Sequence, residues 1–108
     1  MRELKISVAF SDSPGGRTRE EGENSGQEFR DTVLEPIYRE CLENGETLCI
    51  DFDDSFGFGT SFLEEAFGGL VREYGYKDVW SHLKLIANDD ETIHENVPKY
   101  IKAAEAKL

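Results

Sequence analysis

Basic residues are scarce in this sequence. Its 108 residues hold 12 lysines and arginines against 23 aspartates and glutamates, which gives a formal net charge of -11. Such a chain repels phosphate backbones and anionic lipid surfaces, so neither nucleic acid nor a membrane is an expected partner. No apolar run approaches the roughly 20 residues of a membrane span, and the first residues do not resemble a signal peptide. We therefore expect a cytoplasmic protein.

Cysteine and histidine are also rare. Cys41 and Cys49 are the two cysteines of the chain, and both lie inside apolar patterns, so we expect buried, reduced thiols rather than a disulfide. His82 and His94 lack the cysteine or carboxylate spacing of a metal site. The sequence predicts neither a metal nor a cofactor, and it offers no credible catalytic triad.

The apolar residues suffice for one hydrophobic core. Hydrophobic residues make up 38% of the chain, including seven Phe, four Tyr and one Trp, although 32% of the residues are charged. A chain of this length is the usual size of one domain. Residues 1–108 are therefore predicted to fold as a single domain.

Three segments have the patterns of strands. Apolar residues alternate with other residues over 4–10, which predicts a strand with one buried face. Residues 48–52 are almost continuously apolar, as expected of a central parallel strand that is covered on both faces. Residues 83–87 give a third strand.

A first helix is predicted between the first two strands. Ser25 and Glu28 have the spacing of a capping box, and the apolar repeat that follows ends at Asn44. Pro36 lies inside this helix and is expected to kink it, because proline removes a helical hydrogen bond. Residues 11–24 read as an exposed loop with a short hairpin around 17–21.

A second, more apolar helix is predicted over residues 61–74. Ser61 and Glu64 offer another capping box at its start. Gly68 and Gly69 each cost about 1 kcal/mol relative to alanine inside a helix, so a close approach by the sheet or by a partner is expected there.

A final helix begins near residue 91, and its main segment is predicted to start at Pro98. Strands and helices thus alternate along the chain, which favours right-handed parallel crossovers. We expect an α/β domain with a small, mainly parallel sheet of three to four strands packed by helices.

The segment from Ile50 to Ser61 (IDFDDSFGFGTS) resembles a motif of the STAS domains of anti-sigma-factor antagonists. In that family an apolar strand leads to an Asp-Ser-Ser-Gly-Leu motif, whose serine opens the second helix and is phosphorylated by a partner kinase. Thr60 and Ser61 stand at the positions of the two serines, whereas Gly59 replaces the aspartate and Phe62 the glycine. The resemblance implies a protein partner, with a kinase-like ATPase as the candidate.

A second resemblance covers most of the chain. Its motifs are PGGR at 14–17, SGQEFR at 25–30, LEP at 34–36 and SFLEEAFGGL at 61–70. In this order they look like the STAS-like family known as DUF4325. That resemblance implies the fold and carries no established activity.

Thr60 and Ser61 are the candidate regulatory residues. A hydroxyl at a helix start faces unpaired N–H groups and the positive end of the helix dipole, which suits a phosphate. Phosphorylation adds about -1.5 to -2 charges and is expected to repel a partner docked on an acidic surface. The simpler alternative is that one of the two hydroxyls only caps the helix.

The loop from Pro14 to Arg17 gives an alternative, a site for a small anion or a nucleotide. Its candidate residues supply backbone N–H groups and a guanidinium near the start of the first helix, namely Gly15, Gly16, Arg17, Ser25 and Gly26. The loop lacks the Lys-Ser/Thr ending of a P-loop and the spacing of a dinucleotide fingerprint. A plain glycine turn with a surface arginine is the competing interpretation.

An enzymatic interpretation rests on residues 48–55 (LCIDFDDS), which imitate the Asp-x-Asp motif of haloacid-dehalogenase-like phosphatases. There Asp51 would be the nucleophile and Asp53 the general acid, with Mg²⁺ between carboxylates. The chain is short for that fold, and the motif would follow the second strand rather than the first. The sequence therefore favours a regulatory domain that binds a protein through the start of the second helix over independent catalysis.

Overall fold

A three-stranded parallel sheet organises the chain, of which the computed structural model describes residues 1–106. The strands β1 (Arg2–Lys5), β2 (Leu48–Asp51) and β3 (Leu83–Ile86) lie side by side in chain order. Both pairs are parallel, and Ile50 at the centre is paired with Leu4 on one side and Leu85 on the other. The predicted α/β class and the small parallel sheet are confirmed.

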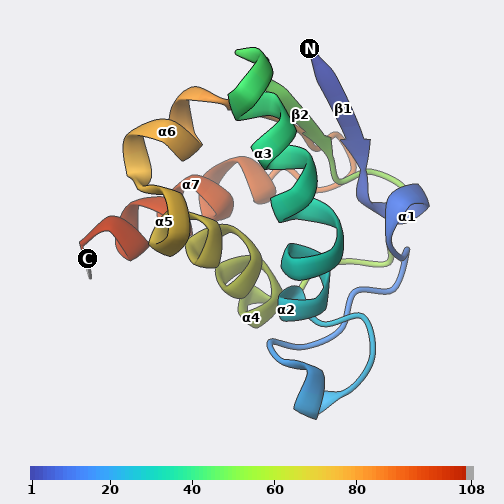
Figure 1. The fold of residues 1–108 in the computed structure, drawn as a ribbon. Coiled ribbons are helices and arrows are strands. Elements are labelled where there is room, and N and C mark those ends of the chain that lie inside the picture. The colour runs from blue at the N-terminus through green and yellow to red at the C-terminus, as the bar shows by residue number, and fades with distance from the viewer. Residues whose placement is uncertain (107–108) are drawn as a thin grey trace.

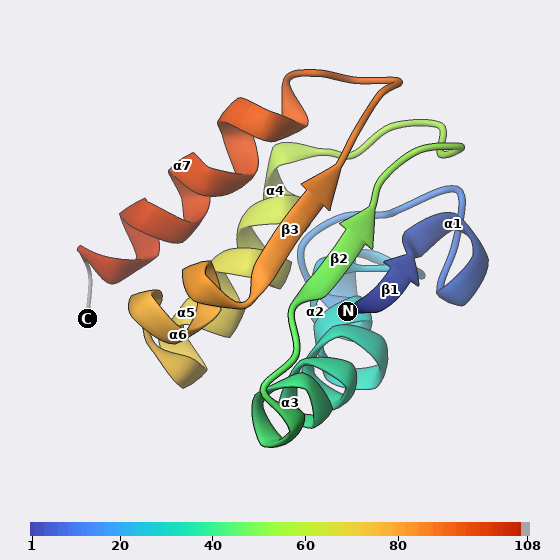
Figure 2. The same cartoon turned by 90° about the horizontal axis from the view of Figure 1, so that it is seen from above.

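Two long helices follow the first two strands, and each is interrupted by a π-helical turn. The first comprises α2 (Gly26–Phe29), η2 (Arg30–Leu34) and α3 (Glu35–Asn44), and the second comprises α4 (Thr60–Leu63), η3 (Glu64–Gly68) and α5 (Gly69–Tyr74). Shorter segments are α1 (Ile6–Ala9), the 3₁₀ turn η1 (Arg19–Glu21) and α6 (Tyr76–Ser81), and α7 (Ile93–Glu105) ends the fold. Figures 1 and 2 show the long helices and α7 gathered on one side of the sheet.

Residues on both faces of β2 are buried over 48–50, as expected, but helices lie against only one of the two faces (Figure 2). Leu48 and Ile50 belong to the core, whereas Cys49 and Asp51 point to the other face. On that face Cys49 lies between the exposed residues Glu3 and Lys84 of the neighbouring strands, and it is only 2% exposed. The short strands therefore shield the thiol with polar neighbours instead of a second helix layer. Both cysteines are buried and free, as predicted.

The predicted strand over 4–10 ends at Lys5. From Ile6 the chain makes the single helical turn α1, in which the N–H groups of Phe10 and Ser11 both donate to the carbonyl of Ile6. Phe10 thereby turns inward and its ring lies 5.2 Å from that of Phe29. Alternation at 6, 8 and 10 fits a strand, but the turn buries Ile6 and leaves Val8 80% exposed.

The first long helix accommodates Pro36 next to a π-helical turn. Ser25 Oγ accepts the N–H of Glu28 at 3.0 Å, as predicted for the start of this helix. Pro36 is the second residue of α3, which directly follows η2, so the wider turn lies where proline cannot donate to the carbonyl of Thr32. The disturbance expected from Pro36 is thus absorbed without ending the helix.

Other predicted boundaries need correction. Gly59, not Ser61, is the N-cap of α4, and no side chain caps this helix start, so the predicted capping box with Glu64 is wrong. The hairpin expected around 17–21 is the turn η1. Pro98 does not start the last helix but lies inside α7, and α6 was not predicted.

One cluster of buried side chains joins the sheet to the helices. Its centre is aromatic, since the rings of Phe29, Phe52 and Phe62 lie within 5.2 to 6.5 Å of other phenylalanine rings. Within residues 1–106, none of the helices has the length and apolarity needed to cross a membrane.

Replacement of Phe67 tests this core. Phe67 is fully buried between Phe29 and Phe52, so Phe67→Ala should lower the free energy of unfolding by about 3 to 5 kcal/mol. Urea denaturation followed by circular dichroism measures this change. A loss below about 1 kcal/mol would mean that Phe67 does not pack where the structure places it.

Candidate functional site

The start of α4 lies at the carboxyl end of the sheet. The segment 52–59 leaves β2 there and leads into the helix, as Figure 2 shows. Thr60 is the exposed first residue of the helix, and Ser61 is half-buried. Because Gly59 occupies the N-cap position without a side chain, neither hydroxyl serves as the helix cap.

Hydrogen bonds join three loops at this end of the sheet. Asp53 accepts the backbone N–H groups of Asn88 and Asp89 at 2.7 and 2.9 Å, and it also accepts the Asn88 amide at 2.9 Å. Asp54 donates its N–H to Asp89 Oδ2 at 2.9 Å. Phe56 donates its N–H to the carbonyl of Asp12 at 2.8 Å. Residues 10–13, 53–59 and 87–92 thus form one connected surface, called here the carboxyl-edge surface.

The bonds to Asp53 explain its acidity and its role. Hydrogen bonds from the backbone of Asp89, and then from the side chain and backbone of Asn88, hold the pKa of the Asp53 carboxyl below its ordinary value. Asp51 Oδ1 in turn accepts the N–H of Asp53 at 2.9 Å. The two aspartates of the phosphatase-like motif therefore fix loops, and residues 1–106 hold no cluster of His, Cys, Asp and Glu arranged for a metal.

Phe56 is exposed although the rings of Phe52 and Phe58 pack with the core. The rings of Phe52 and Phe58 lie 5.3 Å apart, and Phe58 also packs against Phe62. Phe56 is 87% exposed. Sequence reasoning missed this residue, because a segment with phenylalanine at 52, 56, 58 and 62 gives no sign of which ring turns outward.

The candidate anion site is occupied by the protein itself. The N–H groups of Gly26 and Gln27 donate to the carbonyls of Gly16 and Arg17 at 2.9 and 3.0 Å. The next N–H group, that of Glu28, donates to Ser25 Oγ. The start of the first long helix therefore uses its donors to hold the loop of residues 14–17.

Steric contacts within the protein explain why residues 15 and 26 are glycines, without a bound ligand. A methyl group on Gly15 would overlap the carbonyl oxygen of Glu23, and one on Gly26 would come within 2.6 Å of the carbonyl oxygen of Phe62. Gly16 is packed against the side chain of Glu21, 3.3 Å from where its own methyl group would lie. These contacts favour packing glycines over phosphate-binding glycines.

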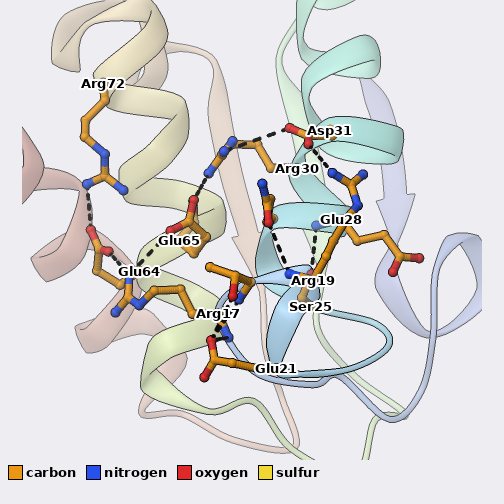
Figure 3. A network of polar contacts seen from close by, with 12 residues as sticks. Arg17, Arg19, Glu21, Ser25, Glu28, Arg30, Asp31, Glu64, Glu65 and Arg72 are labelled. Atoms are coloured by element: carbon orange, nitrogen blue, oxygen red, sulfur yellow. Dashed lines mark hydrogen bonds and ion pairs between the residues drawn. The ribbon is translucent and has the colours of Figure 1, made fainter.

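The guanidinium of Arg17 is bound by carboxylates. It donates to Glu64 (Figure 3), and it lies 3.6 Å from Glu65 Oε1. The hydrogen bond to Glu64 raises the pKa of Arg17. Burial alone would raise the pKa of Glu64, but hydrogen bonds from Arg72 and Arg17 outweigh burial and lower it. An anion could bind Arg17 only by displacing these partners, so the anion site stays a prediction that this geometry does not favour.

Arg17 is part of a larger network, called here the arginine clamp, in which Arg17, Arg30 and Arg72 meet Glu64 and Glu65. Arg30 donates to the side chain of Glu65 and, at 2.6 Å, to its backbone carbonyl. Arg72 donates to Glu64 Oε2 at 2.8 Å. The Arg30 and Glu65 side chains are only 16% and 17% exposed, so their pairing is shielded from solvent far better than a surface ion pair.

The clamp explains why residues 68 and 69 of the second helix are glycines. A methyl group on Gly69 would overlap the guanidinium of Arg30, and one on Gly68 would overlap the carboxylate of Glu64. The predicted close approach is thus present, but charged side chains make it rather than the sheet or a partner. Sequence reasoning singled out Arg17 and the glycines but missed Arg30, Glu64, Glu65 and Arg72 as their partners.

Fold and site together describe a small α/β domain with a parallel sheet and an exposed loop before its second long helix. The chain belongs to the family described as "STAS-like domain of unknown function (DUF4325)", whose model matches residues 25–92. That range holds both long helices, β2 and β3. Comparison with curated proteins and with solved structures gave no match.

The arginine clamp predicts an unusual response to Gly69→Ala. Alanine normally stabilises a helix interior by about 1 kcal/mol relative to glycine. Here the methyl group must displace Arg30, so Gly69→Ala should instead destabilise the protein by about 1 to 3 kcal/mol. Chemical denaturation gives both free energies.

The matched control is the same substitution in an Arg30→Ala protein. Without the guanidinium, Gly69→Ala should be neutral or stabilising by up to about 1 kcal/mol. Equal effects of Gly69→Ala in the two backgrounds would show that Arg30 does not impose the glycine.

Proposed function

We propose that this chain is a regulatory domain that binds another protein through the carboxyl-edge surface and the start of α4. The observation that carries the proposal is the 87% exposure of Phe56 within this surface. Aromatic side chains of this kind are the usual anchors of protein interfaces, because they bury a large area at little conformational cost. Val8, on the α1 turn that follows β1 at the same end of the sheet, is also 80% exposed.

A single exposed apolar residue is ordinary, so the surroundings of Phe56 matter. The N–H of Phe56 donates to the carbonyl of Asp12 in the first loop. Two residues earlier, the N–H of Asp54 donates to Asp89 in the third loop. On either side of Phe56 in the chain, Phe52 is buried in the core and Phe58 packs, partly buried, against the core. The ring is thus presented by a braced loop, and a partner that binds it loses little entropy in ordering the site.

Cross-linking tests the surface directly. A photoreactive benzoylphenylalanine placed at position 56 should cross-link a specific protein in cells, because the ring would lie inside the interface. The same group at Trp80, which is 45% exposed on α6, is the control. Products shared by both positions, or none from position 56, would contradict the proposal.

The purified cross-linked partner then allows affinity to be measured. Phe56→Ala should weaken its binding by about 30-fold or more, as expected for a central aromatic anchor. The same substitution should change the free energy of unfolding by no more than about 0.5 kcal/mol, since the ring touches little of the fold. A large loss of stability with unchanged binding would assign Phe56 to the fold instead.

Thr60 is the better of the two candidate residues for a switch. Its side chain is exposed at the first position of α4, whereas Ser61 is half-buried. Neither hydroxyl is needed as a cap, so a modification at Thr60 would leave the helix start intact. Phosphate there would add about -1.5 to -2 charges beside the carboxyl-edge surface.

Replacement of Thr60 tests the switch. Thr60→Asp should change the affinity for the cross-linked partner several-fold while circular dichroism shows an unchanged fold, and Thr60→Ala should bind like wild type. Ser61→Ala and Ser61→Asp serve as the comparison at the half-buried position. Equal affinity of all these folded proteins would remove Thr60 and Ser61 from the mechanism.

A further inference from the structure

The carboxyl-edge surface concentrates negative charge. Its three loops contain no lysine or arginine, and they hold six carboxylates, namely Asp12, Asp53, Asp54, Asp89, Asp90 and Glu91. Lys5 partly offsets this charge, since its ammonium binds Asp54 at 2.5 Å and lies 4.0 Å from Asp51. One ammonium cannot balance these carboxylates, so the surface around Phe56 is strongly anionic.

This surface differs from the arginine clamp, where Glu64 and Glu65 face guanidinium groups. Most carboxylates of the carboxyl edge meet neutral donors instead. Asp53 and Asp89 accept backbone N–H groups, and Asp90 accepts the N–H and hydroxyl of Thr92. Neutral donors orient a carboxylate but leave its charge in place, and a cluster of like charges destabilises the folded protein. The approach of a cationic group to this surface therefore lowers the free energy of the protein.

We propose, resting on the docking function above, that the partner is a protein whose contact surface has lysine and arginine side chains around an apolar pocket. The pocket receives the ring of Phe56, and the basic rim faces the carboxylates of the three loops. Complementary charge of this kind raises the association rate and rejects acidic competitors. Phe56 supplies the buried anchor that charge alone does not provide.

The charge of the partner also sets the direction of the Thr60 switch. Against a basic rim, added negative charge at Thr60 strengthens association, which reverses the repulsion expected from the sequence. Thr60→Asp therefore binds the partner more tightly than wild type at low salt, and the gain shrinks as salt screens the charges.

A peptide library provides a probe while the partner protein is still unidentified. Random dodecapeptides displayed on phage are selected on the wild-type chain and depleted on Phe56→Ala. The selected peptides should carry several lysines or arginines beside an apolar residue. Their affinity should fall by about tenfold between 50 and 500 mM salt, because the contact is electrostatic at its rim.

Two charge variants separate a specific contact from general attraction to an acidic protein. The first variant removes three charges from the carboxyl edge and is Asp12→Asn/Asp90→Asn/Glu91→Gln. Its two asparagines keep the side-chain oxygen that accepts a hydrogen bond from Ser13 or Thr92. Glu43→Gln/Glu73→Gln/Glu105→Gln removes three charges from exposed positions on other elements. Both proteins have a net charge of -8, from -11 plus 3. The first should weaken peptide binding about tenfold, and the second should change it less than twofold.

Each outcome decides the proposal once thermal melting shows that the variants are folded. Peptides that need Phe56 but lack basic residues, or that ignore salt, would overturn the basic partner and leave the docking function standing. Equal weakening by the two charge variants would reveal non-specific attraction and also overturn it. If no peptide distinguishes wild type from Phe56→Ala, the docking function itself falls.

Discussion

The close approach of the two long helices is the constraint on which the rest of the structure depends. Gly26 on the first helix meets the carbonyl of Phe62 on the second, and Arg30 crosses over Gly69 to reach Glu65. A side chain at Gly26 would separate the helices, whereas one at Gly69 would displace the guanidinium of Arg30. The separation would also open the stack of Phe29 on Phe62, whose rings are 5.6 Å apart. Glycines therefore permit both kinds of contact between the helices: Gly26 allows the backbone of the second helix to approach, and Gly69 leaves room for the guanidinium of Arg30.

This constraint also positions the carboxyl-edge surface. Arg17 ties the loop of residues 14–17 to the second helix through Glu64, one turn beyond Thr60. The start of α4 is thus held from inside the fold, while the segment that precedes it is held from the other side by Asp12 and Asp89. A helix start without a side-chain cap would ordinarily fray. Here the attachments on both sides hold Phe56 and Thr60 in place.

The sequence predicted the helices and strands better than it predicted the contacts between them. The three strands, both long helices, the α/β class and the family follow from periodicity and motifs, because these are local properties. The end of β1 at Lys5 could not be predicted, since positions 6, 8 and 10 fit a strand and the choice is made by the contact of Phe10 with Phe29. The roles of Gly15, Gly26 and Arg17 could not be predicted either. A glycine-arginine loop beside a capped helix is compatible with an anion site until Glu64 and Glu65 are seen to satisfy the arginine.

The pairing of the acidic residues is another property that the sequence does not reveal and the structure does. Sequence shows 23 carboxylates and a net charge of -11, but not which of them are neutralised. In the arginine clamp, carboxylates between the helices face guanidinium groups, and this charge contributes to cohesion of the fold. At the carboxyl edge, carboxylates lie near an exposed phenylalanine and meet mainly neutral donors, so most of their mutual repulsion is not offset by cationic groups. The same residue type thus contributes to cohesion between the two long helices and leaves unbalanced negative charge at the carboxyl edge. The basic partner and the strengthening effect of an acidic group at Thr60, both of which we propose, rest on that charge.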